Sequence, residues 1–369
     1  MSENPFENLG ETIRARLSDA FAVDDVTVPR QGASLRLRGQ FVGESGSAFE
    51  RIQAQLRALG LMALATREKG NTYLYIVKGL APPRPSRWLV NLILLALTVV
   101  TTMLVGSQYR QACNNLIGGP ISLDVLGSPL RLLQGLPFSL GVLLILGAHE
   151  LGHYFLARRH QIAVTLPYFI PVPIGLGTLG AFIRIKAPID SRRSLFDVGI
   201  AGPLAGLVVA FPVLLIGLAL SDVRPCGSTV LGQSLLINGL SALINGAHAR
   251  GWALIMHPLA YAGWVGFLMT GINLLPIGQL DGGHIAYAIF GRYAAPLATG
   301  TLLTMVALSL IYPGWLVWVL LIFTFGVRHP PPLNDVTPLD RRRRVLGLAT
   351  LVFTLLIIVP VPFQVGRLF

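Results

Sequence analysis

The chain has 369 residues, of which 53% are hydrophobic and 12% are charged, whereas about 25% of residues are charged in an average soluble domain. This composition excludes an ordinary water-soluble protein, because so much apolar surface requires lipid around it. The formal charge of +12 and the 2 cysteines indicate neither nucleic-acid binding nor thiol chemistry, because the basic residues lie in short loops between apolar runs and two cysteines cannot form a disulfide scaffold.

Residues 1–80 are predicted to form a small soluble domain of the α+β class. The first residues are acidic and polar, without the basic and apolar stretches of a secretory signal, so we expect a mature, cytoplasmic N-terminus. The domain has no recognisable catalytic cluster, and an adaptor or regulatory role is therefore predicted. Periodicity and capping residues predict a helix over 4–21, a strand over 33–42, a helix over 47–60 and a strand over 72–79.

A basic, proline-rich linker over residues 81–87 leads to a predicted transmembrane domain that covers 88–369. A membrane crossing needs about 20 apolar residues. By this measure we expect an α-helical polytopic protein with about seven crossings and a range of six to eight, because one run is short and follows a Tyr-Pro-Gly turn. The apolar runs lie at 88–106, 137–157, 194–220, 257–276, 294–312, 314–328 and 345–362.

Basic residues are distributed unequally between the two sides of these crossings. With the N-terminus inside, fourteen Lys and Arg residues flank the inner ends and five lie in outer segments. This asymmetry predicts a multi-pass protein of a bacterial inner membrane with its N-terminus in the cytoplasm. Cys113 and Cys226 then both lie outside, where an oxidising compartment permits a disulfide, although the sequence does not show whether the two are close.

Residues 161–190 are apolar but do not resemble a membrane helix, because Pro167, Pro171, Pro173 and several glycines interrupt them. Irregular backbone at membrane depth is tolerated only where it lines a cavity or is buried in protein. We therefore expect a re-entrant or interfacial loop, with strand character over 178–185. A second segment, 231–244, is too short to span and is expected at the outer surface.

His149, Glu150 and His153 form an HExxH motif inside the second predicted crossing. Histidines four residues apart project from one face of a helix, so both can bind one metal ion. Glu150 adjoins the first histidine, where it can act as the general base for a water molecule at the metal. Because each ionisable side chain costs about 3 kcal/mol at the bilayer centre, we prefer a hydrolytic metal site to a chance motif.

A catalytic zinc usually has three protein ligands and one open position. The best third ligand is Asp281, the only acidic residue between Asp222 and Asp335. A proline and three glycines around it are expected to break the helix and to let the carboxylate approach the metal. Asn273 is predicted to support the site by a hydrogen bond or by steadying the broken helix. His284, in the same turn, is either a partner that supports a metal ligand or a loop histidine near the inner surface, and the second interpretation is preferred.

These residues resemble the site-2 protease family of intramembrane zinc peptidases. The HExxH motif and the NxxPxxxLDG pattern over 273–282 occur in the order of that family, both in membrane segments. The resemblance covers about 137–290, the expected metalloprotease core. No PDZ-like module is recognisable, and the N-terminal domain and additional C-terminal crossings are more similar to the branch of cyanobacteria and chloroplasts.

The resemblance implies a metal, a reaction and a substrate. It implies one Zn²⁺ per chain with His149, His153 and Asp281 as ligands, and Glu150 as the catalytic base. The implied substrate is a membrane-anchored protein that is cut within or near its transmembrane helix. In this family a glycine-rich re-entrant strand pairs with extended substrate. The residues that would do so here are Gly177, Thr178, Leu179, Gly180, Ala181 and Phe182.

Other function classes fit these residues less well. An aspartyl intramembrane protease needs a second membrane aspartate opposite Asp281, and a rhomboid-like protease needs a serine nucleophile with a partner histidine. A metal transporter or non-proteolytic scaffold is the remaining alternative, since it would use the same buried polar groups, but it does not require a glutamate beside the metal. The expected partners are the lipid bilayer and a protein substrate, without nucleic acid, and the oligomeric state is open.

Overall fold

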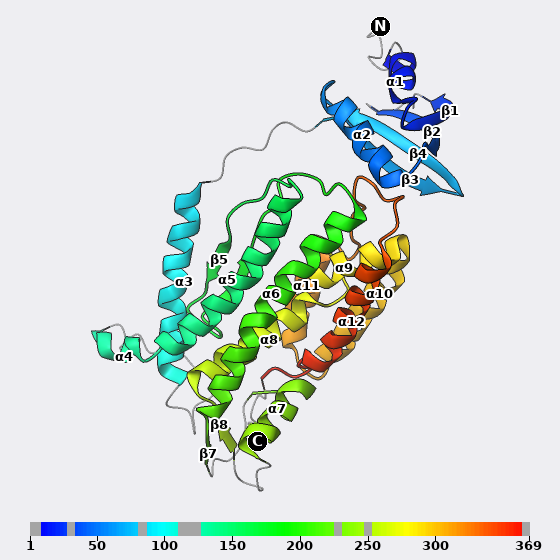
Figure 1. Cartoon of the computed structure of the whole chain (residues 1–369). Helices are drawn as coiled ribbons and strands as arrows, with labels where there is room; N and C mark the ends of the chain where they lie inside the picture. Colours follow the sequence, from blue (N-terminus) through cyan, green and yellow to red (C-terminus); the bar gives the residue numbers. More distant parts are fainter. Residues whose placement is uncertain are drawn as a thin grey trace.

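An α+β unit lies at one end of a helical body in the part of the chain that the structure describes (Figure 1). The structure is a computed structural model that describes residues 9–27, 34–79, 87–109, 127–224, 231–246 and 253–363. Cys113 and Cys226, and with them the disulfide prediction, lie outside these ranges.

The N-terminal unit is a four-stranded antiparallel sheet with two helices. Its elements are α1 (Leu9–Leu17), β1 (Phe21–Thr27), β2 (Ser34–Phe41), α2 (Ser45–Arg57), β3 (Leu61–Glu68) and β4 (Asn71–Lys78). The strand order is β1-β2-β4-β3, so β3 is an edge strand. Alternate residues of β2, such as Leu35 and Leu37, are buried with Ile52 and Leu56 of α2, as the twofold period of a strand requires.

Two strands of this sheet were not predicted from the sequence. Phe21 was expected to end the first helix, but it begins β1, whose register shifts between Val23 and Asp25. This irregularity weakens the alternation by which a strand is recognised. The second helix begins at Ser45 rather than at the expected Ser47, and its N-cap residue makes no side-chain capping bond.

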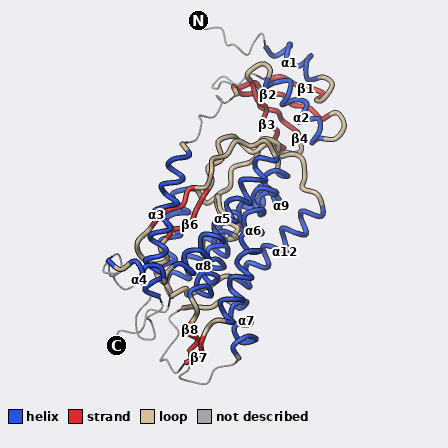
Figure 2. Tube along the Cα trace, turned by 60° about the vertical axis from the view of Figure 1, so that its left-hand side comes forward, coloured by secondary structure: helices blue, strands red, loops and turns tan. Residues whose placement is uncertain are grey.

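The helical body is built from ten α-helices among the described residues, with two short two-stranded sheets. The helices are α3 (Trp88–Tyr109), α4 (Pro129–Leu133), α5 (Leu136–Arg159), α6 (Arg192–Ala219), α7 (Leu235–Asn245), α8 (Pro258–Asn273), α9 (Asp281–Phe290), α10 (Ala294–Ser309), α11 (Gly314–Phe325) and α12 (Arg341–Ile357). One sheet is the hairpin of β5 (Tyr168–Pro171) and β6 (Thr178–Phe182), and the other pairs β7 (Asp222–Arg224) with β8 (Ala253–Ile255). The β7–β8 sheet lies at the end opposite the N-terminal unit (Figure 2).

Three of the described helices are long and apolar enough to cross a bilayer, namely 88–108, 136–159 and 192–219. Helices occupy all seven expected positions, but the other four have 16, 16, 12 and 17 residues. A helix of 16 residues is about 24 Å long, less than the hydrocarbon core of about 30 Å. The count of seven crossings therefore stays a prediction.

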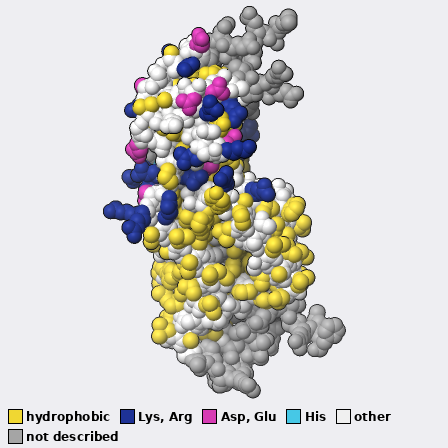
Figure 3. Space-filling model, turned by 90° about the vertical axis from the view of Figure 1, so that its right-hand side faces the viewer, with side chains coloured by type: hydrophobic (Ala, Val, Ile, Leu, Met, Phe, Trp, Pro, Cys, Tyr) yellow, Lys and Arg dark blue, Asp and Glu magenta, His cyan; other side chains and the backbone are white. Residues whose placement is uncertain are grey.

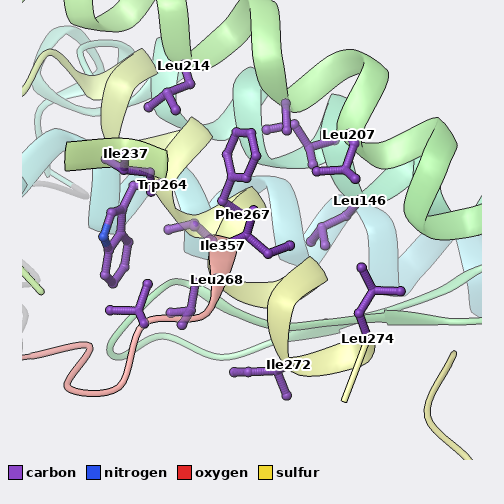
Figure 4. Close-up of a cluster of buried hydrophobic side chains, with 14 of the residues drawn as sticks. Leu146, Leu207, Leu214, Ile237, Trp264, Phe267, Leu268, Ile272, Leu274 and Ile357 are labelled. Atoms are coloured by element: carbon purple, nitrogen blue, oxygen red, sulfur yellow. The ribbon is translucent and has the colours of Figure 1, made fainter. Parts of the chain in front are cut away.

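The centre of the helical body is α8, which is buried on nearly all sides between α5, α6 and α12. A helix that is apolar all round is buried in protein. Tyr261, Trp264 and Phe267 are fully buried, and Figure 4 shows two of them among side chains of α6 and the ends of α7 and α12. Trp264 donates a 2.6 Å hydrogen bond from Nε1 to the carbonyl oxygen of Gly232.

The outside of the helical body is apolar, and basic side chains gather where it meets the N-terminal unit (Figure 3). Large apolar side chains are exposed along α3, α10 and α11. Such a band is far larger than the apolar patches of soluble proteins and fits contact with lipid. The arrangement agrees with the separation of apolar runs and basic loops in the sequence.

Candidate active site

The helix α5 carries His149, Glu150 and His153, and all three side chains are buried. Small residues let α6 approach α5 closely at this level. A Cβ atom on Gly202 of α6 would lie only 2.0 Å from Nε2 of His153. Glycine at this position therefore allows two helices to enclose the histidines, as small residues do where membrane helices pack closely.

Asp281 comes to the same place from a distant part of the sequence. After α8 ends at Asn273, the chain turns through residues 274–280 before Asp281 begins α9. Gly278 has φ of +57°, a conformation that glycine adopts without strain. The break that the sequence predicted is thus present, and it directs the carboxylate toward α5.

Three donor atoms converge at this point. Nε2 of His149 lies 3.1 Å from Nε2 of His153 and 3.1 Å from Oδ2 of Asp281, and Nε2 of His153 lies 3.3 Å from Oδ1 of Asp281. Tetrahedral zinc with bonds of about 2.0 to 2.1 Å separates its ligand atoms by about 3.3 to 3.4 Å. The donor set, two imidazoles and one carboxylate, therefore fits Zn²⁺ in chemistry and in spacing.

A second set of contacts orients the imidazole of His153. Its Nδ1 lies 2.7 Å from the carbonyl oxygen of Val198 on α6. When Nδ1 donates a proton to that oxygen, Nε2 is left as the unprotonated donor, which is the usual arrangement for a metal-binding histidine. Val198 contributes only its backbone to this bond, so its side chain gave no indication of the contact.

A cavity of about 220 Å³ adjoins the three donor atoms. Glu150 lies at this cavity together with Ile183, which follows β6. The sequence also pointed to Asn273, Ala181 and Phe182, which line the same cavity. Among the other lining residues, Ile183 and Ile185 lie in the segment of expected strand character, Leu280 belongs to the NxxPxxxLDG pattern, and His284 was expected in a loop. The sequence did not point to Val198 or Gln279.

The other expected substrate-binding residues lie farther along the β5–β6 hairpin. Gly177, Thr178, Leu179 and Gly180 do not line the cavity. The hydroxyl of Thr178 bonds within the hairpin, to the carbonyl oxygens at 170 and 180. The side chain of Leu179 is exposed. The strand β6 pairs only with β5 in this two-stranded sheet, so its second edge has no strand partner among the described residues.

His284 is not the loop histidine that the sequence suggested. It is partly buried on α9, and its Nδ1 lies 3.1 Å from Nε2 of His329 in the loop after α11. The glycines before it suggested a turn, but they lie in the first turn of α9, where close packing requires them. Burial and, to a smaller extent, the neighbouring His284 lower the pKa of His329 to about 3, so this imidazole is neutral at physiological pH.

Residues 137–312 match the sequence model of peptidase family M50. This part of the chain is therefore similar to that family. The M50 core, as residues 137–312 are called below, contains both halves of the donor set and the β5–β6 hairpin. The match confirms the resemblance to site-2 proteases, on which the expectations of a metalloprotease and a zinc cofactor rested. The family and the apolar helices also support an integral membrane protein.

The chain is also similar to named plant proteins. The probable zinc metalloprotease EGY2, chloroplastic, of Arabidopsis thaliana is 37% identical over 238 residues, covering 62% of this chain and 42% of that protein. The probable zinc metalloprotease EGY1, chloroplastic, of Oryza sativa subsp. japonica is 29% identical over 394 residues, covering 97% of this chain and 64% of that protein. The alignments thus span about two fifths to two thirds of these relatives. Both are chloroplastic by name, so they do not support the expected bacterial inner membrane.

Proposed function

We propose that this chain is an intramembrane zinc endopeptidase in which His149, His153 and Asp281 bind the metal and Glu150 is the general base. One observation carries the proposal: two histidines of one buried helix and an aspartate from a separate broken helix have donor atoms within 4.8 Å of one another. Bringing these groups together in an apolar body is costly unless they share a cation.

The chemistry follows from the position of Glu150 between the two histidines. Zinc would supply Lewis acidity and lower the pKa of a bound water to about 7. The buried carboxylate of Glu150 lies at the cavity beside the donor atoms, where it can take a proton from the attacking water and pass it to the leaving amine.

The substrate we propose is a membrane-anchored protein that binds as an added strand. The free edge of β6 supports this role, because an extended peptide can pair with an unpaired strand edge. The exposed side chains of Leu179 and Phe182 would contact alternate residues of such a peptide. The end of β6 leads directly to Ile183 and hence to Glu150, so a peptide that continues along this edge reaches the general base.

We further propose the division of the chain that its composition suggested: a cytoplasmic adaptor or regulatory domain over 1–80, a linker over 81–87 and a transmembrane domain over 88–369. The position of the N-terminal unit at the basic end of the helical body supports an inner location for both. On this topology the metal lies about 13 Å below the inner surface, since His149 precedes Arg158 by nine residues.

The experiment that tests the mechanism compares two variants with the wild type in detergent or liposomes. Glu150→Gln should keep bound zinc but lose about 100-fold to 10,000-fold in cleavage of a transmembrane test substrate, the range expected for a general base. Asp281→Ala should lose both zinc and cleavage. Glu11→Gln, on the exposed first turn of α1, is the matched control and should behave as the wild type.

The outcomes separate the enzyme from the transporter or scaffold. Undiminished cleavage by Glu150→Gln excludes this hydrolytic mechanism. A wild-type protein that binds zinc but cuts no transmembrane substrate, even after the substrate panel is widened, favours a transporter or scaffold, because neither requires a general base.

A further inference from the structure

A short extended segment connects the N-terminal unit to the helices of the M50 core. We call it the docking strand, residues Leu333 to Asp335, between α11 and α12. On one side, the backbone N–H of Ala65 on β3 donates to the carbonyl oxygen of Leu333 at 2.7 Å, and the N–H of Asp335 donates to the carbonyl oxygen of Ala65 at 3.0 Å. The docking strand therefore occupies the edge of the N-terminal sheet, in parallel orientation.

The other side of the docking strand bonds to the residues just before α6. The N–H of Leu333 donates to the carbonyl oxygen of Ile189 at 2.9 Å, and the N–H of Asn334 donates to that of Asp190 at 2.8 Å. The side chain of Leu333 packs in the core of the N-terminal unit, and Asn334 is 2% exposed. Because the docking strand is hydrogen-bonded along both edges and two of its side chains are buried, the backbone of Asp335 has little freedom to move.

The carboxylate of Asp335 then joins two helices of the M50 core. Its Oδ1 accepts a 2.8 Å hydrogen bond from Nε of Arg192, the first residue of α6. Its Oδ2 accepts a 3.1 Å hydrogen bond from the hydroxyl of Tyr287 on α9. Both partners are largely buried, with side-chain exposures of 18% for Arg192 and 15% for Asp335, so water competes weakly for these bonds.

The two helices that Asp335 joins, α6 and α9, also position side chains of the donor set beside α5. The carbonyl of Val198 on α6 orients His153, and α9 begins at Asp281. Tyr287 is six residues from Asp281, or about 9 Å along the helix. The loop between α11 and α12, which contains the docking strand, also contacts α9 at a second point, where His329 lies against His284. The distance between Asp281 and the histidines therefore depends on how this loop holds α9 against α6.

We propose that Asp335 is a positioning residue of the metal centre, and that the docking strand on β3 fixes it in place. The inference rests on the proposed function, because it assumes that the donor set binds a metal. Asp335 touches neither the metal nor the substrate. It acts through Tyr287, so that loss of their hydrogen bond lets the carboxylate of Asp281 drift from its position beside the histidines, and metal ligands held less firmly bind the metal less tightly.

The test measures metal affinity on the full-length chain in detergent. Tyr287→Phe removes the hydroxyl that bonds Asp335 and keeps the aromatic ring, and Tyr75→Phe is the matched control, since the hydroxyl of Tyr75 donates to Glu68 on the N-terminal unit at 3.1 Å. Zinc affinity is measured by competition with a chromophoric chelator, and the visible spectrum of the Co²⁺ form reports the coordination geometry.

Tyr287→Phe should weaken zinc binding about 10-fold, at the lower end of the range for groups that support metal ligands, and should alter the Co²⁺ spectrum. Asp335→Asn should act in the same direction, and Tyr75→Phe should match the wild type in both measurements. The positioning role is overturned if Tyr287→Phe folds and has the same zinc affinity and the same Co²⁺ spectrum as Tyr75→Phe. If the wild type itself binds neither zinc nor Co²⁺, the proposed function fails as well, so the two failures are distinguishable.

Discussion

Replacing Gly202 by alanine tests directly how α6 holds the metal-binding helix. The added Cβ would lie 2.0 Å from Nε2 of His153, whereas ordinary contact begins at 3.4 Å. Because real Cβ contacts essentially never fall below 3.0 Å, the imidazole or α6 must move by at least about 1 Å. The imidazole has little room to turn away, because Val198 holds its other nitrogen at 2.7 Å. We expect His153 and α6 to separate and the three donor atoms to lose their spacing.

This movement is large compared with the tolerance of a zinc site. Metal-ligand distances vary by about 0.2 Å around their ideal values, and a misplacement of about 1 Å can lower an enzymatic rate about 100-fold. Overpacking of a tight contact also destabilises a protein by about 1 to 3 kcal/mol. Gly202→Ala should therefore lose most of its bound zinc and at least about 100-fold in cleavage.

The matched control is Gly147→Ala, on the metal-binding helix two residues before His149. No atom lies within 4 Å of the Cβ that this change adds, and alanine favours a helix over glycine by about 1 kcal/mol. Zinc content is measured by atomic emission, cleavage with a transmembrane test substrate and folding by thermal unfolding in detergent. The reasoning is refuted if Gly202→Ala keeps zinc and cleavage at the level of Gly147→Ala.

Three further predictions concern the metal, the β6 edge and the core. A strong chelator should abolish cleavage and added Zn²⁺ should restore it, because the donor set has an open side at the cavity; activity that survives complete metal removal contradicts the site. Leu179→Asp should raise KM for a transmembrane substrate without loss of zinc, whereas Leu59→Asp on the N-terminal unit should not, and equal KM values would exclude binding along β6. Trp264→Phe removes the bond to Gly232 and should lower stability by about 1 to 2 kcal/mol, while Trp88→Phe, at an exposed position, should not; unchanged unfolding of both would contradict the role of that bond.

The parts of the site that lie close together in sequence could be predicted best. His149 and His153 are one helical turn apart, so helix periodicity alone brings them onto one face. Asp281 required a different argument, in which the need for a third ligand and the helix-breaking residues around it narrowed the choice. The structure brings all three together.

Contacts made by the backbone could not be predicted in this way. The carbonyl of Val198 that orients His153, and the N–H groups that hold the docking strand, belong to residues of ordinary type. The bond between Arg192 and Asp335 joins positions 143 residues apart, and no local pattern connects them. The strand β3 was missed for another reason, because it pairs along its whole length with the neighbouring β4 and meets the docking strand only at Ala65.

His284 shows how one sequence signal can have two structural meanings. The adjacent glycines of Asp281-Gly-Gly-His284 suggested a flexible turn, because glycine is common where a chain must reverse. In the structure their Cβ atoms would collide with the backbone of 274–278, so glycine serves close approach rather than a turn, and α9 begins directly at the metal ligand. Sequence periodicity over ten residues is too short to distinguish these cases.

The three metal-binding side chains are therefore held with different firmness, because the histidines lie on a long, well-packed helix and Asp281 lies on a short one. The helices α5 and α6 are long and packed against each other along small residues, so the two histidines share a rigid frame. The helix α9 has 10 residues, follows an irregular segment and depends on the loop after α11 for two of its side-chain contacts. Because that loop is bonded to β3, a change in how the N-terminal unit sits on the helical body should reach Asp281 before it reaches either histidine. Metal affinity depends on all three ligands. We therefore expect a perturbation of the N-terminal unit to lower metal affinity even when it is too small to unfold the M50 core.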